Sequence, residues 1–126
     1  MNRFPRQLED FVARFNRGSF WESHEILEAA WRETGSDFYQ GLILFASAFV
    51  HVRRANLHGV RAQLAKAVSR LGGYRPSYLG VDVDAVLDAA DAARRAVDVG
   101  ILPVAPDLTL DPALIRGDEP ELAGQT

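Results

Sequence analysis

The chain has 126 residues, of which 48% are hydrophobic and 25% charged, and its net charge at pH 7 is −3. This length and composition fit one globular domain with its own hydrophobic core. The absence of cysteine excludes disulfides, cysteine nucleophiles and zinc sites built from thiolates, and it is compatible with a reducing cytosol.

The sequence contains neither a membrane-spanning stretch nor a basic tract. Its longest apolar run, residues 42–50, is interrupted by Ser47 and is too short to cross a bilayer. The first twelve residues lack the apolar core of a signal peptide. Basic residues are scattered among acidic ones, so we expect neither a nucleic-acid partner nor a membrane partner. A soluble, cytoplasmic protein is therefore predicted.

The hydrophobic pattern predicts helices along most of the chain. Apolar residues at helical spacing predict a first helix from about Pro5 to Asn16. Ser19 and Glu22 have the spacing of a capping box, which predicts the start of a second helix after Ser19. Gly35 suits its end.

The third predicted helix, residues 38–55, begins after a capping Ser36 or Asp37 and is apolar on most of its circumference. A helix of this composition is central in a small fold. Because so much apolar surface needs cover, the sequence is also compatible with a homodimer.

The remaining sequence predicts two more helices and an extended arm. The helices cover about residues 60–71 and 82–99, and beyond Gly100 four prolines oppose a regular helix. We therefore predict an all-α fold, a compact antiparallel bundle of about five helices with a proline-rich C-terminal arm. Residues 1–116 would form the single domain, and residues 117–126 a frayed tail.

The stretch FWESHEILEAAW in the second helix carries an unusual polar stripe. Trp21, His24, Glu28 and Trp31 are spaced by three, four and three residues, so they share one helix face. A matching stripe follows in the third helix, where it comprises Gln40, Leu44, Ser47, His51 and Arg54. A short connection makes the two helices antiparallel neighbours, which would bring His24 opposite His51.

The first hypothesis for these residues is a metal centre. In the His-Glu-x-x-His motif of zinc hydrolases, two histidines bind the metal and the glutamate is the base. Here His24, Glu28 and His51 would bind a divalent Zn, Mn or Fe ion, and Glu25 would be the general base. The metal would activate water for hydrolysis of an unknown small-molecule substrate.

The side that receives the substrate would be shaped by Trp21, Trp31 and Gln40, and Arg54 belongs to the same candidate pocket. A second hypothesis needs no metal: Trp21, Trp31 and Tyr39 would be the walls of a pocket for a small anion or an amide, and Arg53 or Arg54 would supply the charge.

The third hypothesis is structural. His24, Glu28 and His51 would form a buried hydrogen-bond network that fixes the register of two helices, since a buried carboxylate needs partners. The protein would then be a non-catalytic binding or interaction module.

The sequence also resembles a known family. The run FNRGSFWESHEILEAAW, followed by YQGLILFASAFVHVRRANLHGV, is similar to the motifs of domain of unknown function 309. The resemblance spans about residues 11–87 and includes Gly18, His24, Glu28, His51 and Gly59. It implies a small all-helical fold and the label of a predicted metal-dependent hydrolase, which rests on the same HExxE motif.

Overall fold

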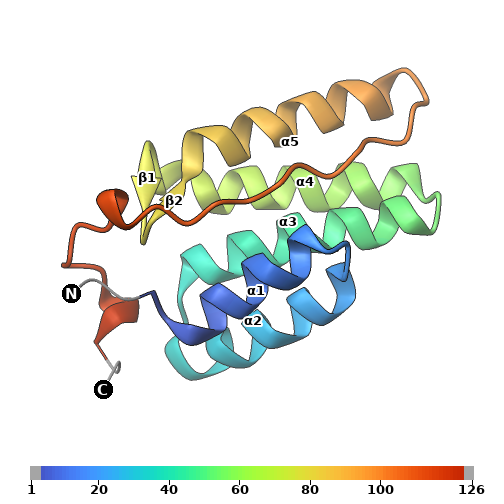
Figure 1. The fold of residues 1–126 in the computed structure, drawn as a ribbon. Helices are drawn as coiled ribbons and strands as arrows, with labels where there is room; N and C mark the ends of the chain where they lie inside the picture. Colours follow the sequence, from blue (N-terminus) through green and yellow to red (C-terminus); the bar gives the residue numbers. More distant parts are fainter. Residues whose placement is uncertain (1–3, 124–126) are drawn as a thin grey trace.

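The structure, a computed structural model, describes residues 4–123 and confirms the all-α prediction (Figure 1). Its α-helices are α1 (Arg6–Asn16), α2 (Phe20–Thr34), α3 (Asp37–Arg53), α4 (Leu57–Leu71) and α5 (Val83–Asp98). The described residues also form three short 3-10 helices: η1 (Gly72–Tyr74) directly after α4, and η2 (Pro112–Leu114) and η3 (Pro120–Leu122) after α5. Within residues 4–123, no helix is long and apolar enough to cross a membrane.

Helix α3 lies at the centre of the fold because it is the most apolar helix. It packs against α2 on one side and α4 on the other, while α1 covers α2 and α5 covers α4. Phe45 and Phe49 of α3 contact Phe15 of α1, with ring centroids 5.7 Å apart in each pair. Burial of these rings supplies much of the hydrophobic stabilisation.

Local sequence signals explain most of the helix ends. The Ser36 hydroxyl accepts a hydrogen bond from the Tyr39 N–H at 3.1 Å, and Gly35 ends α2 with φ of 67°. Asn56 caps α4, which therefore starts three residues before the predicted position. The predicted capping box is wrong, because the Ser19 side chain makes no capping hydrogen bond.

The loop predicted around Pro76 contains a small hairpin. Strand β1 (Ser77–Tyr78) pairs antiparallel with β2 (Val81–Asp82). Leu79 and Gly80 form the two-residue turn, with φ of 53° and 83°, as a turn between twisted strands requires. This hairpin leads directly into α5.

After Gly100 the chain returns along the bundle as the predicted arm, which runs between α1 and α5 in Figure 1. The Asn16 side chain holds it at both backbone groups of Leu108: it donates to the carbonyl at 2.8 Å and accepts from the N–H at 2.7 Å. Val81 forms an isolated bridge with Leu110. The arm is thus extended and anchored.

Residues 117–123 differ from the predicted frayed tail. Glu119 is 3% exposed and accepts hydrogen bonds from three backbone N–H groups, those of Leu79, Arg116 and Gly117. Glu121 accepts hydrogen bonds from the Tyr78 and Ser36 hydroxyls. Two carboxylates therefore fix this segment to the hairpin and to the N-cap of α3. The rest of the predicted tail, residues 124–126, lies outside the described part.

Candidate functional site

Helix α2 presents the predicted stripe, and its first half is arranged around His24. The His24 ring stacks on the Trp21 indole with centroids 5.1 Å apart and planes inclined by 12°. Its Nε2 lies 3.5 Å from Glu28 Oε2, one helical turn further on. Its Nδ1 is buried and has no hydrogen-bond partner among the described residues.

Glu28 is shared between two neighbours on its own helix. Its second carboxylate oxygen is 2.5 Å from the Arg32 guanidinium, so Glu28 lies between an imidazole and a cation. Glu25, the predicted general base, is exposed on another side of α2. The HExxE motif therefore brings His24 and Glu28 together and leaves Glu25 in solvent.

His51 lies in the last turn of α3 and contacts the connection between α3 and α4. Its Nδ1 lies 3.2 Å from the Asn56 side-chain nitrogen, while the Asn56 oxygen accepts from the Gly59 N–H at 3.0 Å. A Cβ on Gly59 would lie 2.5 Å from His51 Nδ1, so only glycine leaves room for the ring. The three residues form one unit that closes this turn and caps α4.

The predicted ligands His24, Glu28 and His51 do not come together as a set of three around one point. Among residues 4–123, no three His, Cys, Asp or Glu side chains are grouped closely enough to hold a metal ion. His24 and Glu28 approach each other, but His51 is not grouped with them as a third ligand. Protein zinc centres use at least three side-chain ligands, so this pair alone does not fit one.

The predicted pocket residues separate into two groups. Trp21 and Arg54 line an open groove of about 340 Å³ at the start of α2. Trp31 instead packs against the core, and Gln40 is half-buried away from this groove. Tyr39, the third proposed wall, is 2% exposed and belongs to the core.

Arg53 is a cation of the groove at the start of α2, and it contacts both Phe20 and Gly18. Its guanidinium carbon lies 5.0 Å from the centroid of the Phe20 ring, a cation–π contact. A Cβ on Gly18, where φ is 82°, would lie 2.7 Å from an Arg53 nitrogen. The sequence analysis noted Gly18 only as part of the family resemblance, and the structure shows that its lack of a side chain makes room for this guanidinium.

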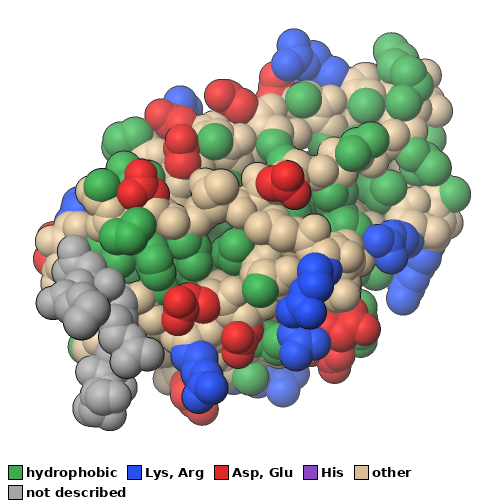
Figure 2. Space-filling view, viewed as in Figure 1, with side chains coloured by type: hydrophobic (Ala, Val, Ile, Leu, Met, Phe, Trp, Pro, Cys, Tyr) green, Lys and Arg blue, Asp and Glu red, His purple; other side chains and the backbone are tan. Residues whose placement is uncertain are grey.

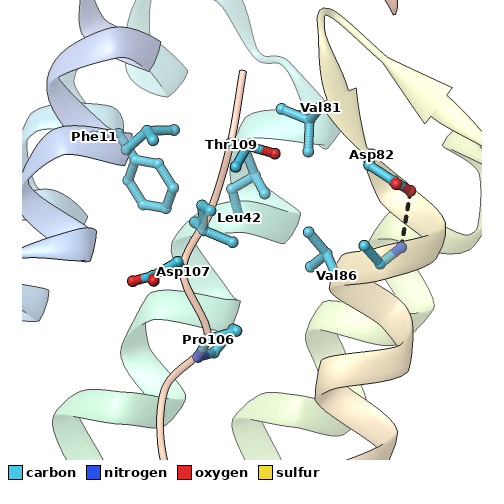
Figure 3. Close-up of a pocket in the computed structure, with 11 residues that line it drawn as sticks. Phe11, Leu42, Val81, Asp82, Val86, Pro106, Asp107 and Thr109 are labelled. Carbon is cyan, nitrogen blue, oxygen red and sulfur yellow. Dashed lines mark hydrogen bonds between the residues drawn. The ribbon is translucent and has the colours of Figure 1, made fainter. Parts of the chain in front are cut away.

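Arg53 also lines a second open groove, of about 400 Å³, with Arg17 on one side and Val104 of the arm on another. A third cavity lies beneath the arm (Figure 3). It measures about 50 Å³ and is bordered by side chains that include Phe11, Leu42 and Val86. This volume has room for only a few water molecules and is too small for an organic substrate with the side chains in these positions.

The sequence analysis did not identify the cluster at the C-terminal segment that consists of Tyr78, Glu119 and Glu121. Burial, followed by the hydrogen bond to Glu121, raises the pKa of Tyr78 far above its ordinary value. Burial would raise the pKa of Glu119 as well, but hydrogen bonds from backbone N–H groups lower it overall. These side chains are hydrogen-bonded to other residues of the chain, so we assign them the role of anchoring the C-terminal segment.

The comparisons with known proteins agree with the resemblance of the motifs. The model of a family described as Domain of unknown function (DUF309) matches residues 8–63. This range contains the HExxE motif, His51 and the Asn56–Gly59 turn. The search of curated proteins found no match, and neither did the search of solved structures.

Proposed function

We propose a role from the site itself, because residues 8–63 match only a family of unknown function: the protein is a non-catalytic binding module. In this proposal His51 braces the connection between α3 and α4, His24 and Glu28 stabilise α2 locally rather than forming a shared network with His51, and partners bind elsewhere on the surface. The observation that carries it is the use of His51, whose ring is held by Asn56 and packed over Gly59.

The bracing role follows from which groups each motif residue contacts. His51 connects the last turn of α3 to the cap of α4, and these two helices pack on each other more extensively than any other pair of described helices. His24 and Glu28 make their contacts within α2 itself, with Trp21 and Arg32. These side chains make their contacts with other residues of the chain, without a ligand. The exception is the His24 Nδ1 atom, which is buried and has no hydrogen-bond partner among the described residues.

A metal-dependent hydrolase is the alternative function, and the unpaired His24 Nδ1 is the observation that favours it. It requires a third ligand beside His24 and Glu28, which residues 4–123 do not supply. Elemental analysis of protein purified without chelator separates the two hypotheses. Close to one equivalent of Zn, Mn or Fe, lost in His24→Ala, would replace the binding-module proposal with the hydrolase.

A stability experiment tests the bracing role directly. Because His51→Ala removes a hydrogen bond and leaves a void above Gly59, we expect it to lower the free energy of unfolding by about 1–3 kcal/mol. Glu25→Ala is the matched control within the same motif, and since Glu25 is exposed its cost should stay below about 0.5 kcal/mol. Urea unfolding followed by circular dichroism measures both, and equal effects would contradict bracing.

A further inference from the structure

The topology gathers three turns at one end of the bundle. Consecutive helices are antiparallel, so α1, α3 and α5 end where α2 and α4 begin, at the right of Figure 1. An ion pair between Arg61 at the start of α4 and Asp98 at the end of α5 joins two of these turns. We call residues 14–22, 51–61 and 94–107 together the basic end.

The basic end has a charge opposite to that of the whole chain. It contains seven of the fourteen Lys and Arg residues but three of the seventeen Asp and Glu residues, which gives it a net charge of +4. The net charge of the chain is −3, so the remaining residues carry −7. Such a separation creates a positive local potential despite the acidic total.

Several of these cations are free to meet an external anion. Arg61 is paired with Asp98, and Arg94 and Arg95 are paired with Asp91. Within residues 4–123, by contrast, Arg17, Arg53 and Arg54 form no ion pair with a carboxylate. Two acidic residues border the same grooves without forming an ion pair with these arginines: Glu22 lines the groove of Arg53 and Arg54, and Asp107 lines the groove of Arg17 and Arg53.

The same end exposes most of the large apolar side chains that reach solvent. In the described part of the chain, six large apolar side chains are exposed, and all except Val68 belong to the basic end. Their exposed fractions range from 43% to 90%, and they are Trp21, Val99, Ile101, Leu102 and Val104. On the right of Figure 2, exposed hydrophobic side chains lie above a group of Lys and Arg side chains.

Apolar and basic side chains are neighbours rather than separate patches. Val104 shares a groove of about 400 Å³ with Arg17 and Arg53, and Arg53 shares the adjoining groove with Trp21. The surface is thus a projecting aliphatic segment bordered by unpaired guanidinium groups and one indole.

We propose that the basic end docks onto an anionic phospholipid surface. The headgroup phosphates would contact Arg17, Arg53 and Arg54, because guanidinium groups bind phosphate through paired N–H donors. The aliphatic side chains of residues 99–104 would enter the interface, with Trp21 at headgroup depth. This inference rests on the proposed binding function and names its partner.

The exposed aliphatic side chains distinguish a lipid surface from other anionic partners. A nucleic acid offers phosphates and base edges, and it would leave residues 99–104 in water. A bilayer provides both the negative charge and the apolar medium. Binding of this kind is peripheral and weakens with salt, since the charges are exposed.

The experiment is flotation of the full chain with vesicles of phosphatidylcholine, with and without 30% phosphatidylglycerol. Binding is expected with the anionic vesicles and is expected to fall as the salt concentration rises. Arg54→Glu should weaken it at least about fivefold, because one basic residue near such a surface contributes about that factor. Val104→Asp should weaken it about tenfold through the loss of apolar burial.

Two variants outside the basic end serve as matched controls. Lys66→Glu makes the same charge change as Arg54→Glu, and Val68→Asp makes the same change as Val104→Asp at another exposed valine. Both controls should float like the wild type. Circular dichroism should show unchanged melting for Val104→Asp, since that side chain is 90% exposed.

Three results would overturn the proposal. One is an absence of binding to anionic vesicles at low salt, and another is equal weakening by the controls. The third is a dimer in sedimentation that Val104→Asp dissociates, because the surface would then bind a second copy. Each would leave the effect of His51→Ala on stability intact, so failure here is distinguishable from failure of the bracing role.

Discussion

Replacement of Glu119 tests how the C-terminal segment is attached. The side chain is buried, and its two oxygens accept from the N–H groups of Leu79 at 3.0 Å, Arg116 at 3.1 Å and Gly117 at 2.8 Å. Leu79 occupies the hairpin turn with φ of 53°, a conformation that leucine rarely adopts. The carboxylate therefore holds both the arm and this turn.

The magnitude follows from the groups that Glu119→Ala would leave unpaired. The Leu79 N–H is buried and would lose its only acceptor, which costs about 1–3 kcal/mol. The Arg116 and Gly117 N–H groups lie in exposed residues and can bind water, so their loss adds about 1 kcal/mol. We expect a total loss of about 2–4 kcal/mol, and about half of that in Glu119→Gln, which keeps one acceptor oxygen.

The pH dependence provides an independent measurement on the same residue. Because folding lowers the pKa of Glu119, its ionised form stabilises the native state above the pKa of the unfolded chain. That contribution is lost as the pH falls from there through the lowered pKa. Glu119→Gln should therefore show a smaller loss of stability between neutral and acidic pH than the wild type.

Urea unfolding at several pH values measures both effects. Asp118→Asn is the matched control, since its carboxylate is adjacent in sequence but lies on an exposed residue. A loss below about 0.5 kcal/mol in Glu119→Ala, or one equal to that of Asp118→Asn, would refute the anchoring role.

Three further predictions concern the helix turns and the arm. Gly59→Ala should cost about 1–3 kcal/mol in urea unfolding, and at least about 0.5 kcal/mol less in the His51→Ala background, because part of the clash is then removed. If the effects of Gly59→Ala and His51→Ala on stability were additive, the packing of the His51 ring against Gly59 would be excluded. Asn16→Ala should lower stability by about 1–2 kcal/mol and speed proteolysis near Leu108, whereas an unchanged digestion pattern would contradict this anchor. Ser36→Ala should lower the melting temperature, since it loses a cap contribution of about 1 kcal/mol, and an unchanged melting temperature would argue against the cap.

The helices were predictable because their signals are local. Apolar spacing and cap residues such as Ser36 act over a few positions, so the predicted bounds lie within a few residues of the observed ones. The capping box at Ser19 failed although its spacing was right, since spacing alone does not orient a hydroxyl group.

The candidate site was predictable only in part. The proximity of His24 and Glu28 follows from the period of one helix, and the structure confirms this contact. The proximity of His51 to that pair depended on the rotation of α3 about its axis, which no periodicity determines. His51 instead contacts Asn56, five residues later in the chain.

The sequence by itself determined the helix content, the central place of α3 and the extended arm, because apolar period and proline act locally. Only the tertiary structure decided which polar residues meet and where the charges gather. Basic residues that are scattered along the sequence meet at one end because antiparallel packing returns three distant turns to the same place. The charge of a surface is a property of the folded chain, and composition gives only its sum.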